Sequence, residues 1–493
     1  MTLLLLSLFV ITLCLGLHNT NAAQLRHSSN NSDAATDGQT QRPQYRTLCA
    51  DSVQSDRDVA LESRTATSVG NDDVLIACND EGFADVFPCS NIDLMSFMTR
   101  DTFDFVLMND IWGWTDPETG IEYAIVCSFS GTHFVDLSDP TMPIYLAALP
   151  TNGDDAMWHD AKTWDHYVYI VSDLAGEHGV QIYDLTALRD IPRTGEVSLP
   201  IQVEASGVYT AIKSAHNIAI NEATGFAYVV GDRSTCNGGL HMIDLKNNPI
   251  DPDFAGCFFE DGYTHDVQCV VYRGPDVDYV GHEVCFASNE DTLTIVDVSD
   301  KENPVMLSRY ESSRIPFAYS HQGWLSEDHR IFFLDDEVDE VRTGVKTRTF
   351  VMDVTDLTDP ELSYLYTNEL SSASDHNQFV LGELLFQSNY RSGLRVIDIS
   401  QREVGVMKEV GFFDTVPESD EAGFRGAWSV YPYFASGNIL IYSMDEGFFV
   451  VKPRNSPGRP TTRASMAPAA AVVGASFAFH PMTVLFSSQT DVA

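Results

Sequence analysis

Short apolar segments rich in β-branched and aromatic residues recur along the chain, and Gly, Pro, Asp or Asn bounds each of them. Apolar runs of this length and composition are typical of β-strands. Residues 158–203 contain four such runs in succession: WHDAKTW, YVYIVSD, VQIYDLT and GEVSLPIQV. The same order recurs in the segments on both sides, so the pattern predicts consecutive units of four strands.

One motif marks the third strand of each unit: an apolar run that ends in Asp and then breaks at a turn. It reads LTIVDVSD at Leu293 and LRVIDIS at Leu394. The repeated Asp occupies positions 136, 184, 244, 297, 353 and 398, and a degenerate copy, FFVVKP, has Lys452 there. A period near fifty residues with strand character predicts an all-β fold, a seven-bladed β-propeller. We expect the repeated Asp to accept backbone N–H groups in the turn that follows.

The seventh unit lacks a fourth strand at its C-terminal end. Residues 92–98, IDLMSFM, resemble the fourth strands of other units. We therefore expect this segment to pair with Phe448–Val451 and to close the ring, which would remove an exposed sheet edge. The alternative is a loop without a partner strand.

The segments outside the propeller, which we assign to residues 74–453, differ in composition. Residues 1–23 are apolar and end in small residues, as in a secretory signal peptide, with an uncleaved anchor helix as the alternative. Residues 24–73 are polar and predicted to be disordered, with a glycosylation sequon at Asn30. Residues 454–493 form a linker and a weakly apolar tail: a weak membrane anchor, a cleaved lipid-anchor signal or a plain tail. A secreted or cell-surface location follows.

The charge narrows the choice of partners. The chain has 71 acidic and 29 basic residues and a net charge of −42, which repels nucleic acid and anionic membranes. It suits a solvated extracellular surface, divalent cations or a basic partner. We expect an unidentified protein or glycan as the partner, no nucleic acid, and membrane attachment only through the C-terminal segment.

Eight cysteines remain once the leader is removed, and an even number favours disulfides in a secreted chain. Proximity in sequence suggests Cys78–Cys89, Cys236–Cys257 and Cys269–Cys285. Cys49 and Cys127 are then either paired with each other or free. The chain has no CxxC motif, which argues against a zinc ribbon.

Histidines mark the starts of the first strands. Five of these strands open with His followed by a carboxylate or amide residue: His159, His216, His265, His321 and His376. The other two units have Asn109-Asp110 and Gly426-Ala427 at this point. Second strands end in Asp or Asn: Asp173, Asp232, Asn289, Asp335 and Asn389. Antiparallel neighbours place these ends beside the histidines, close to the central channel.

Two interpretations of this ring remain open. In the first, each blade holds a structural His–Asp or His–Asn hydrogen bond. In the second, the five imidazoles converge on a transition metal, with the Asp and Asn residues as second shell; calcium would instead suit the Asp-rich loops. We find no GxSxG, P-loop, HExxH or dinucleotide motif, and so predict no catalytic residue. The acidic residues 335–337 and 339–340 are interpreted as a solvated loop, and the tryptophans as core residues.

Several blocks resemble a known family. They are GFADVFPCSNIDLMSF from Gly82, NDIWGWTDPETGIEYAIV from Asn109, the SDP turns and the His-Asp/Asn strand starts. They look like the choice-of-anchor B family of secreted LVIVD-repeat propellers, over roughly residues 73–453. The resemblance implies an extracellular propeller without an established reaction. The first functional hypothesis is therefore a binding or adhesion module, and the alternative is a metal-binding protein or metal-dependent enzyme with its site at the channel mouth.

Overall fold

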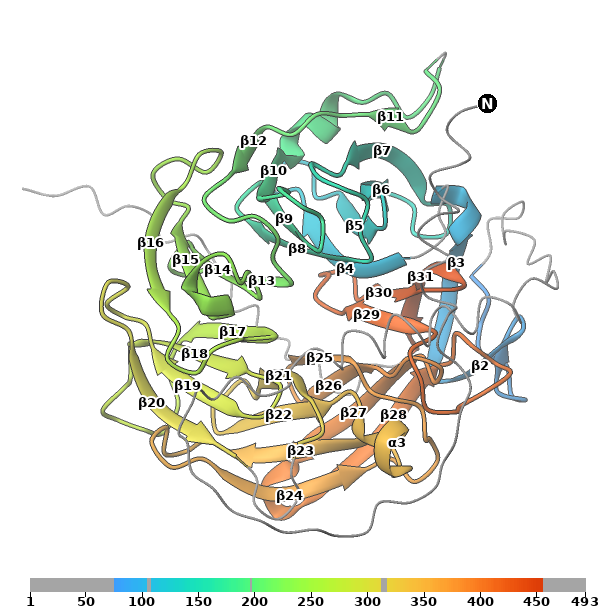
Figure 1. The fold of residues 1–493 in the computed structure, drawn as a ribbon. Coiled ribbons are helices and arrows are strands. Elements are labelled where there is room, and N and C mark those ends of the chain that lie inside the picture. Colours follow the sequence, from blue (N-terminus) through green and yellow to red (C-terminus); the bar gives the residue numbers. More distant parts are fainter. Residues whose placement is uncertain (1–74, 104–107, 196, 312–316, 455–493) are drawn as a thin grey trace, which may run out of the picture. The chain divides into compact units, whose positions relative to one another are not determined.

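The computed structural model describes residues 75–103, 108–195, 197–311 and 317–454. These residues form seven sheets around a central axis, and each sheet is one blade (Figure 1). The first strand of every blade lies innermost and contacts the first strands of its two neighbours. The predicted seven-bladed propeller is thereby confirmed.

The strands of the first four blades follow the chain order. Blade 1 has β4 (Met108–Thr115), β5 (Glu122–Ser128), β6 (Gly131–Asp136) and β7 (Ile144–Pro150). Blade 2 has β8 (Trp158–Trp164), β9 (Tyr167–Asp173), β10 (Val180–Asp184) and β12 (Gly207–Tyr209). Blade 3 has β13 (Asn217–Asn221), β14 (Phe226–Val230), β15 (Leu240–Asp244) and β16 (Asp253–Phe258). Blade 4 has β17 (Asp266–Val271), β18 (Glu283–Ser288), β19 (Leu293–Asp297) and β20 (Val305–Tyr310).

Blade 5 also follows the chain order, whereas blades 6 and 7 add N-terminal strands to C-terminal ones. Blade 5 has β21 (Ser320–Leu325), β22 (Ile331–Asp336), β23 (Arg348–Asp353) and β24 (Glu361–Thr367). Blade 6 has β25 (Asn377–Leu381), β26 (Leu384–Ser388), β27 (Leu394–Gln401) and β28 (Val406–Phe413), extended by β2 (Phe87–Ser90) and β1 (Phe83–Ala84). Blade 7 has β29 (Ala427–Tyr431), β30 (Ile439–Ser443), β31 (Gly447–Pro453) and β3 (Ile92–Thr99).

Helical segments are short. They are one α-helical turn within the described ranges, α3 (Asp339–Thr343), and the 3₁₀ turns η1 (Arg100–Phe103), η2 (Leu185–Asp190), η3 (Cys236–Gly238) and η4 (Arg402–Val404). No helix in the part of the chain that the structure describes has the length and apolar character needed to cross a membrane.

The repeated Asp of the third strands ends each strand in the same way. Its carboxylate accepts the N–H of the second residue after it, at 2.8–2.9 Å in all six copies. Such a bond mimics a backbone turn and satisfies an N–H group that leaves the sheet. The predicted turn-capping role is confirmed, and it explains why the motif recurs once in each of these units.

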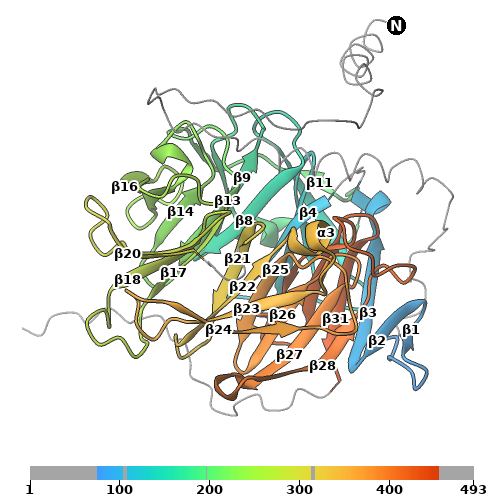
Figure 2. The ribbon, with the colours of Figure 1, turned by 60° about the horizontal axis from the view of Figure 1, so that its bottom comes forward.

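The N-terminal strand β3 pairs antiparallel with β31, from Ile92 opposite Pro453 to Thr99 opposite Gly447. It is the fourth strand of blade 7, as the sequence pattern predicts. The preceding hairpin β1–β2 lies on the outer edge of blade 6, where Cys89 pairs with Phe413 (Figure 2). Consecutive N-terminal strands thus join two adjacent blades, and β3 covers the edge of β31 that would otherwise be exposed.

One predicted strand assignment is wrong. We expected residues 195–203 to form the fourth strand of blade 2. Instead β11 (Ile201–Gln202) pairs parallel with β7 on the outer edge of blade 1, and β12 takes the place in blade 2. Either outer edge can satisfy the backbone of a short apolar run, and hydrophobic pattern alone does not specify which.

The three predicted disulfides, Cys78–Cys89, Cys236–Cys257 and Cys269–Cys285, are confirmed. Cys127 is a buried free thiol. Cys49, the signal peptide, the polar segment with Asn30 and the C-terminal tail lie outside the described residues, so these assignments stay predictions.

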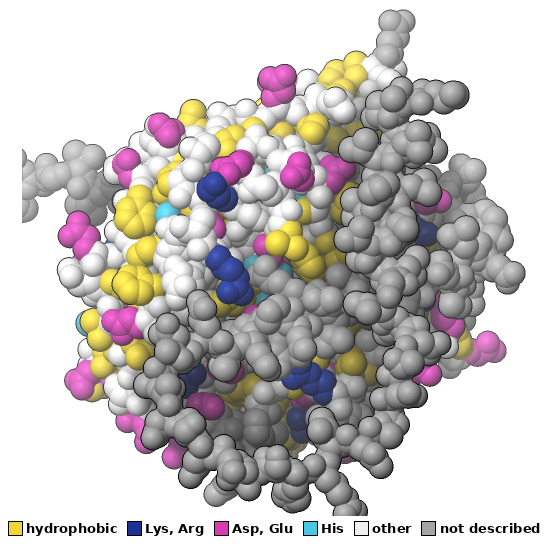
Figure 3. Space-filling model, in the orientation of Figure 1, with side chains coloured by type: hydrophobic (Ala, Val, Ile, Leu, Met, Phe, Trp, Pro, Cys, Tyr) yellow, Lys and Arg dark blue, Asp and Glu magenta, His cyan; other side chains and the backbone are white. Residues whose placement is uncertain are grey.

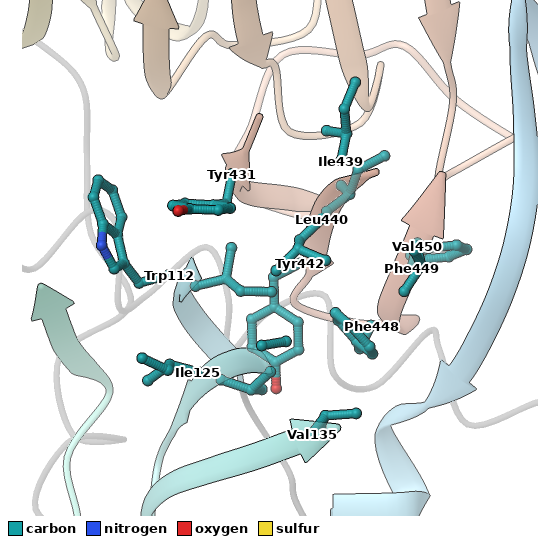
Figure 4. Packing of buried hydrophobic residues seen from close by; sticks show 14 of the residues in the cluster. Trp112, Ile125, Val135, Tyr431, Ile439, Leu440, Tyr442, Phe448, Phe449 and Val450 are labelled. Atoms are coloured by element: carbon teal, nitrogen blue, oxygen red, sulfur yellow. The ribbon is translucent and has the colours of Figure 1, made fainter. Parts of the chain in front are cut away.

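The core is built between adjacent blades. Tyr442 extends from β30 toward Ile125 and Val135 of blade 1, while Phe448 and Phe449 pack nearby on β31 (Figure 4). Neighbouring sheets cover both faces of the middle strands, which explains why runs such as EYAIVCS and ILIYS are buried at every position. This packing fixes the first strands around the channel.

Candidate functional site

Four of the five predicted histidines line one cavity in the central channel. His216, His265, His321 and His376, which we call the imidazole row, come from blades 3 to 6. Their ring centroids are 4.4, 4.3 and 4.4 Å apart in that order. In the view of Figure 3, histidine side chains are visible at the centre of the ring of blades. Residues more than 150 positions apart in sequence therefore form one contiguous surface.

His159 does not join the row. Strand β8 begins at Trp158, so His159 lies inside the strand, opposite Ser172. Its side chain packs against His178, at 5.8 Å between ring centroids, and its Nε2 lies 3.4 Å from Thr151 Oγ1. Burial lowers the pKa of His159 to about 3. The inclusion of His159 in a single ring is wrong, because the register of β8 turns its side chain away from the others.

Tryptophans stand at the two ends of the row. Trp158 lies 6.2 Å from His216, and Trp428 lies 4.4 Å from His376. In blade 7 we had placed Gly426-Ala427 at the equivalent position, but Trp428 occupies it. From blade 2 to blade 7, each blade thus places an aromatic ring, imidazole or indole, next to that of the following blade.

The imidazoles are held by bonds between blades. The Nδ1–H groups of His265, His321 and His376 donate to the carbonyl oxygens of His321, His376 and Trp428, at 2.9, 2.9 and 2.6 Å. A carbonyl only accepts, so Nδ1 carries the proton and Nε2 carries the lone pair in each neutral ring. Burial lowers the pKa of His265 and His376 well below the usual value, which keeps both rings neutral.

The predicted His–Asp or His–Asn pair inside each blade is found in blade 5 alone among the described blades. There His321 Nδ1 lies 3.3 Å from Asp335 Oδ1. His216 instead pairs with Asp173 of the preceding blade, at 3.0 Å. Asp232 accepts the backbone N–H groups of Lys213 and Ser234, and Asn289 donates to Asp261. Asn389 follows β26 in blade 6, and both atoms of its side-chain amide are buried without a hydrogen-bond partner.

A carboxylate that the sequence analysis had assigned to a solvated loop faces the row. Glu337 Oε2 lies 3.9 Å from His321 Nε2, and its Oε1 lies 3.8 Å from His376 Nε2. Tyr390 donates to Glu337 Oε1 at 2.6 Å. One potential ligand atom from each of His321, Glu337 and His376 lies within 4.8 Å of the other two.

The surrounding acidic segment is buried, so the solvated-loop assignment is wrong. Asp335, Asp336, Glu337, Asp339 and Glu340 are each at most 5% exposed. The segment turns inward because Asp336 accepts the N–H groups of Ala318 and Tyr319, and Asp339 pairs with Arg348. Burial is the main cause that raises the pKa of Glu337. No Asp-rich loop in the described ranges brings three carboxylates as close as the His321–Glu337–His376 group.

Below the imidazole row, the cavity of about 670 Å³ has two further layers. The first is a polar layer, lined by Asp110, Asp160, Asn217, Asp266, Gln322 and Asn377. In blades 3 to 6 its member is the residue that follows the histidine of the imidazole row. Two residues farther along β4, β21 and β25 lie Trp112, Trp324 and Phe379, and Tyr431 of β29 packs against Trp112. We call these four residues the aromatic layer. The tryptophans were predicted to be core residues: Trp112 and Trp114 belong to the buried core, and Trp112 and Trp324 also line this cavity. The recurring HD, HN and HQ dipeptides could have indicated the polar layer.

Comparisons with known proteins agree with the fold. The LVIVD repeat family model matches residues 276–312, so the chain carries an LVIVD-type repeat on a β-propeller. No curated protein matches the chain. The match does not extend to the choice-of-anchor B subfamily, which stays a resemblance.

The similar solved structures include the following three. A functionally unknown protein from Desulfotomaculum acetoxidans shares 15% identity, with 64% of this chain and 87% of that chain covered and a TM-score of 0.43. A protein from Lactobacillus plantarum shares 13% identity, with 68% and 89% covered and a TM-score of 0.44. The β-propeller domain of Cps50 (Swd1) from Myceliophteria thermophila shares 10% identity, with 73% and 98% covered and a TM-score of 0.45.

Proposed function

We propose that this chain is an exported propeller that binds a divalent transition-metal ion at His321, His376 and Glu337. The observation that carries the proposal is the approach of two buried imidazole nitrogens and one buried carboxylate within 4.8 Å of one another. Two histidines and one carboxylate form the protein ligand set of several zinc sites and of non-haem iron sites. Such sites leave at least one coordination position for water or an exogenous ligand.

The hydrogen bonds of the two imidazoles support this role. Ligating histidines usually donate their second ring N–H to a carbonyl or carboxylate, which orients the ring and fixes the tautomer. His321 and His376 do so through Nδ1, and their Nε2 atoms lie on the side of Glu337. Tetrahedral ligands at about 2.0–2.1 Å from zinc lie roughly 3.3 Å apart. The present 3.8–3.9 Å separations would therefore need to shrink by about half an ångström.

A metal ion would also compensate the buried charge. Glu337 lies among other buried carboxylates, and the repulsion from Asp336 adds to the effect of burial on its pKa. A divalent cation would stabilise the ionised form of Glu337 and so oppose the effect of burial on its pKa. Metal binding would explain why a carboxylate is buried here, which the hydrogen bond from Tyr390 alone does not explain.

Export is proposed on separate grounds: the apolar leader at residues 1–23 and the three disulfides, which persist in oxidising compartments. The hypothesis of an adhesion module with a protein or glycan partner stays a prediction.

The test is metal binding by the purified full chain. After dialysis against a chelator, wild-type protein should take up one equivalent of Zn²⁺ or Co²⁺, measured by elemental analysis and cobalt absorption spectra. Glu337→Gln keeps an acceptor for Tyr390 and removes the charge, and should weaken uptake at least tenfold. His159→Gln, another buried histidine outside the row, serves as the matched control and should bind like wild type. Equal uptake by wild type and Glu337→Gln, or no uptake by wild type, would refute the proposal.

A further inference from the structure

We propose that the central cavity binds an alkylammonium ligand with an aromatic or apolar body, and that the Asp266 carboxylate receives the ammonium group. The proposal concerns the polar and aromatic layers below the imidazole row and does not require a metal ion. Most side chains of the polar layer form hydrogen bonds between neighbouring blades, and Asp266 departs from this pattern.

Most members of the polar layer bond to the next blade around the ring. Asn217 donates to the carbonyl of His265, and Asp160 accepts the N–H of Ile218. Gln322 makes two such bonds, because its amide accepts the N–H of Gln378 and donates to the carbonyl of the same residue. These side chains are structural: their polar atoms join the blades.

Asp266 differs from its equivalents. Within the described residues, the one hydrogen bond of its carboxylate is to the N–H of Val267, at 2.6 Å, in its own strand. The side chain lines the cavity and is partly accessible, although it lies deep inside the protein. Burial raises the pKa of Asp266 to about 6, while the Lys162 ammonium opposes that rise. At pH 7.5 the group is therefore mostly ionised and open to the cavity.

The charges around Asp266 favour a cation over an anion. The one lysine that lines the cavity, Lys162, is already held by Asp160 and by Asp110, and its ammonium lies 4.6 Å from the centre of the Trp112 ring. Three carboxylates of the polar layer thus face the Lys162 ammonium, which is already engaged. Arg273, Glu222 and Glu327 also line the cavity, so its lining has five carboxylates and two cationic side chains. An anionic ligand would have to displace these contacts, whereas a cation adds a charge-assisted hydrogen bond to Asp266.

The aromatic layer provides the surface for the rest of the ligand. Trp112, Trp324 and Phe379 lie two strand residues below the polar layer, which corresponds to about 7 Å, and Tyr431 packs against Trp112. Their rings pack edge to face, with centroids 5.0–5.9 Å apart for the contacting pairs. A ligand with an amine and a ring or alkyl group separated by two or three bonds would span both layers. The cavity volume lies in the usual range for small-molecule sites.

The experiment is calorimetric titration of the full chain at pH 7.5 with 2-phenylethylamine, against 2-phenylethanol and 3-phenylpropionate as neutral and anionic analogues. The amine should bind at least tenfold more tightly than either analogue. Asp266→Asn should reduce amine affinity at least tenfold, because it removes the charge and retains the shape. Asp278→Asn, an exposed carboxylate, should leave the affinity unchanged.

The pH dependence gives a second readout. Protonation of Asp266 removes the anion, so amine affinity should fall between pH 7.5 and pH 5, and the fall should be absent in Asp266→Asn. Equal binding of the three analogues, unchanged affinity in Asp266→Asn, or no amine binding at millimolar concentration would each overturn the proposal. A Glu337→Gln variant that still binds the amine would show that the two sites are independent.

Discussion

Lys162 offers the sharpest test of how charge is arranged in the channel. Its ammonium contacts Asp160 Oδ1 and lies 3.3 Å from Asp110 Oδ2. The side chains of all three residues are at most 14% exposed. Burial lowers the pKa of Lys162, but the two carboxylates outweigh it and the pKa is raised. For Asp110, burial raises the pKa and the lysine more than reverses the effect.

The perturbation is Lys162→Met, which keeps the aliphatic volume and removes the charge. Removing one partner of a buried ion pair leaves an uncompensated charge and typically costs about 3–5 kcal/mol. Here two carboxylates lose their cation, so we expect a loss of unfolding free energy in this range at pH 8. Adding Asp160→Asn should recover at least half of the loss, because one of the two repelling charges is then gone.

The pH dependence of this loss has a definite sign. Burial already holds the folded-state pKa of Asp160 well above its usual value, and the Asp110 carboxylate adds to the rise. Without the lysine, the pKa of Asp110 also rises above its unfolded value of about 4. The folded state then binds more protons, and stability falls as the pH rises through that window. The difference between variant and wild type should be small at pH 4 and complete at pH 8.

These differences in stability are measured by urea unfolding, monitored by tryptophan fluorescence and circular dichroism. Variants are compared only where their m-values are equal. If the Lys162→Met variant is as stable as wild type at pH 8, the reasoning is refuted. A loss that is independent of pH, or one that Asp160→Asn leaves unchanged, would refute it as well.

Two further predictions concern stability. Burial, with the repulsion from Asp445, raises the pKa of Glu446 to about 7, so this group destabilises the folded state progressively as the pH rises from about 4.5 to 7. Glu446→Gln should therefore raise the melting temperature at pH 8 and not at pH 4, by scanning calorimetry; a gain at both would contradict the assignment. Cys78→Ala with Cys89→Ala opens the loop that holds the β1–β2 hairpin on blade 6, with a local cost of about 2–3 kcal/mol. Limited proteolysis should then cut near Phe83 first, and unchanged resistance would argue against it.

Local features were predictable because their cause is local. The turn after the third strand needs an acceptor two residues before an unsatisfied N–H, and Asp297 and its equivalents provide it in each unit. The disulfides joined close sequence neighbours, and Cys269 and Cys285 are directly opposite on β17 and β18. The match of β3 to the missing strand followed from counting four strands in each unit.

The candidate site was only partly predictable. The repeat position identified four histidines of the row. His159 is outside it because β8 pairs with β9 without a bulge, whereas the register of β21 shifts at His321. Glu337 had been assigned to solvent, because a run of acidic residues in a loop is usually hydrated, whereas here neighbouring backbone N–H groups turn it inward. Asp266 resembled its equivalents in sequence and differs from them only in its hydrogen bonds.

The sequence by itself determined the blade: its four strands, its turn and the number of its copies, since each depends on residues within about fifty positions of one another. Only the tertiary structure decided which side chains meet in the channel, which carboxylates are buried and which outer edge takes β11. Those outcomes depend on contacts between blades, where strand register and hydrogen bonds from distant segments set the direction of each side chain.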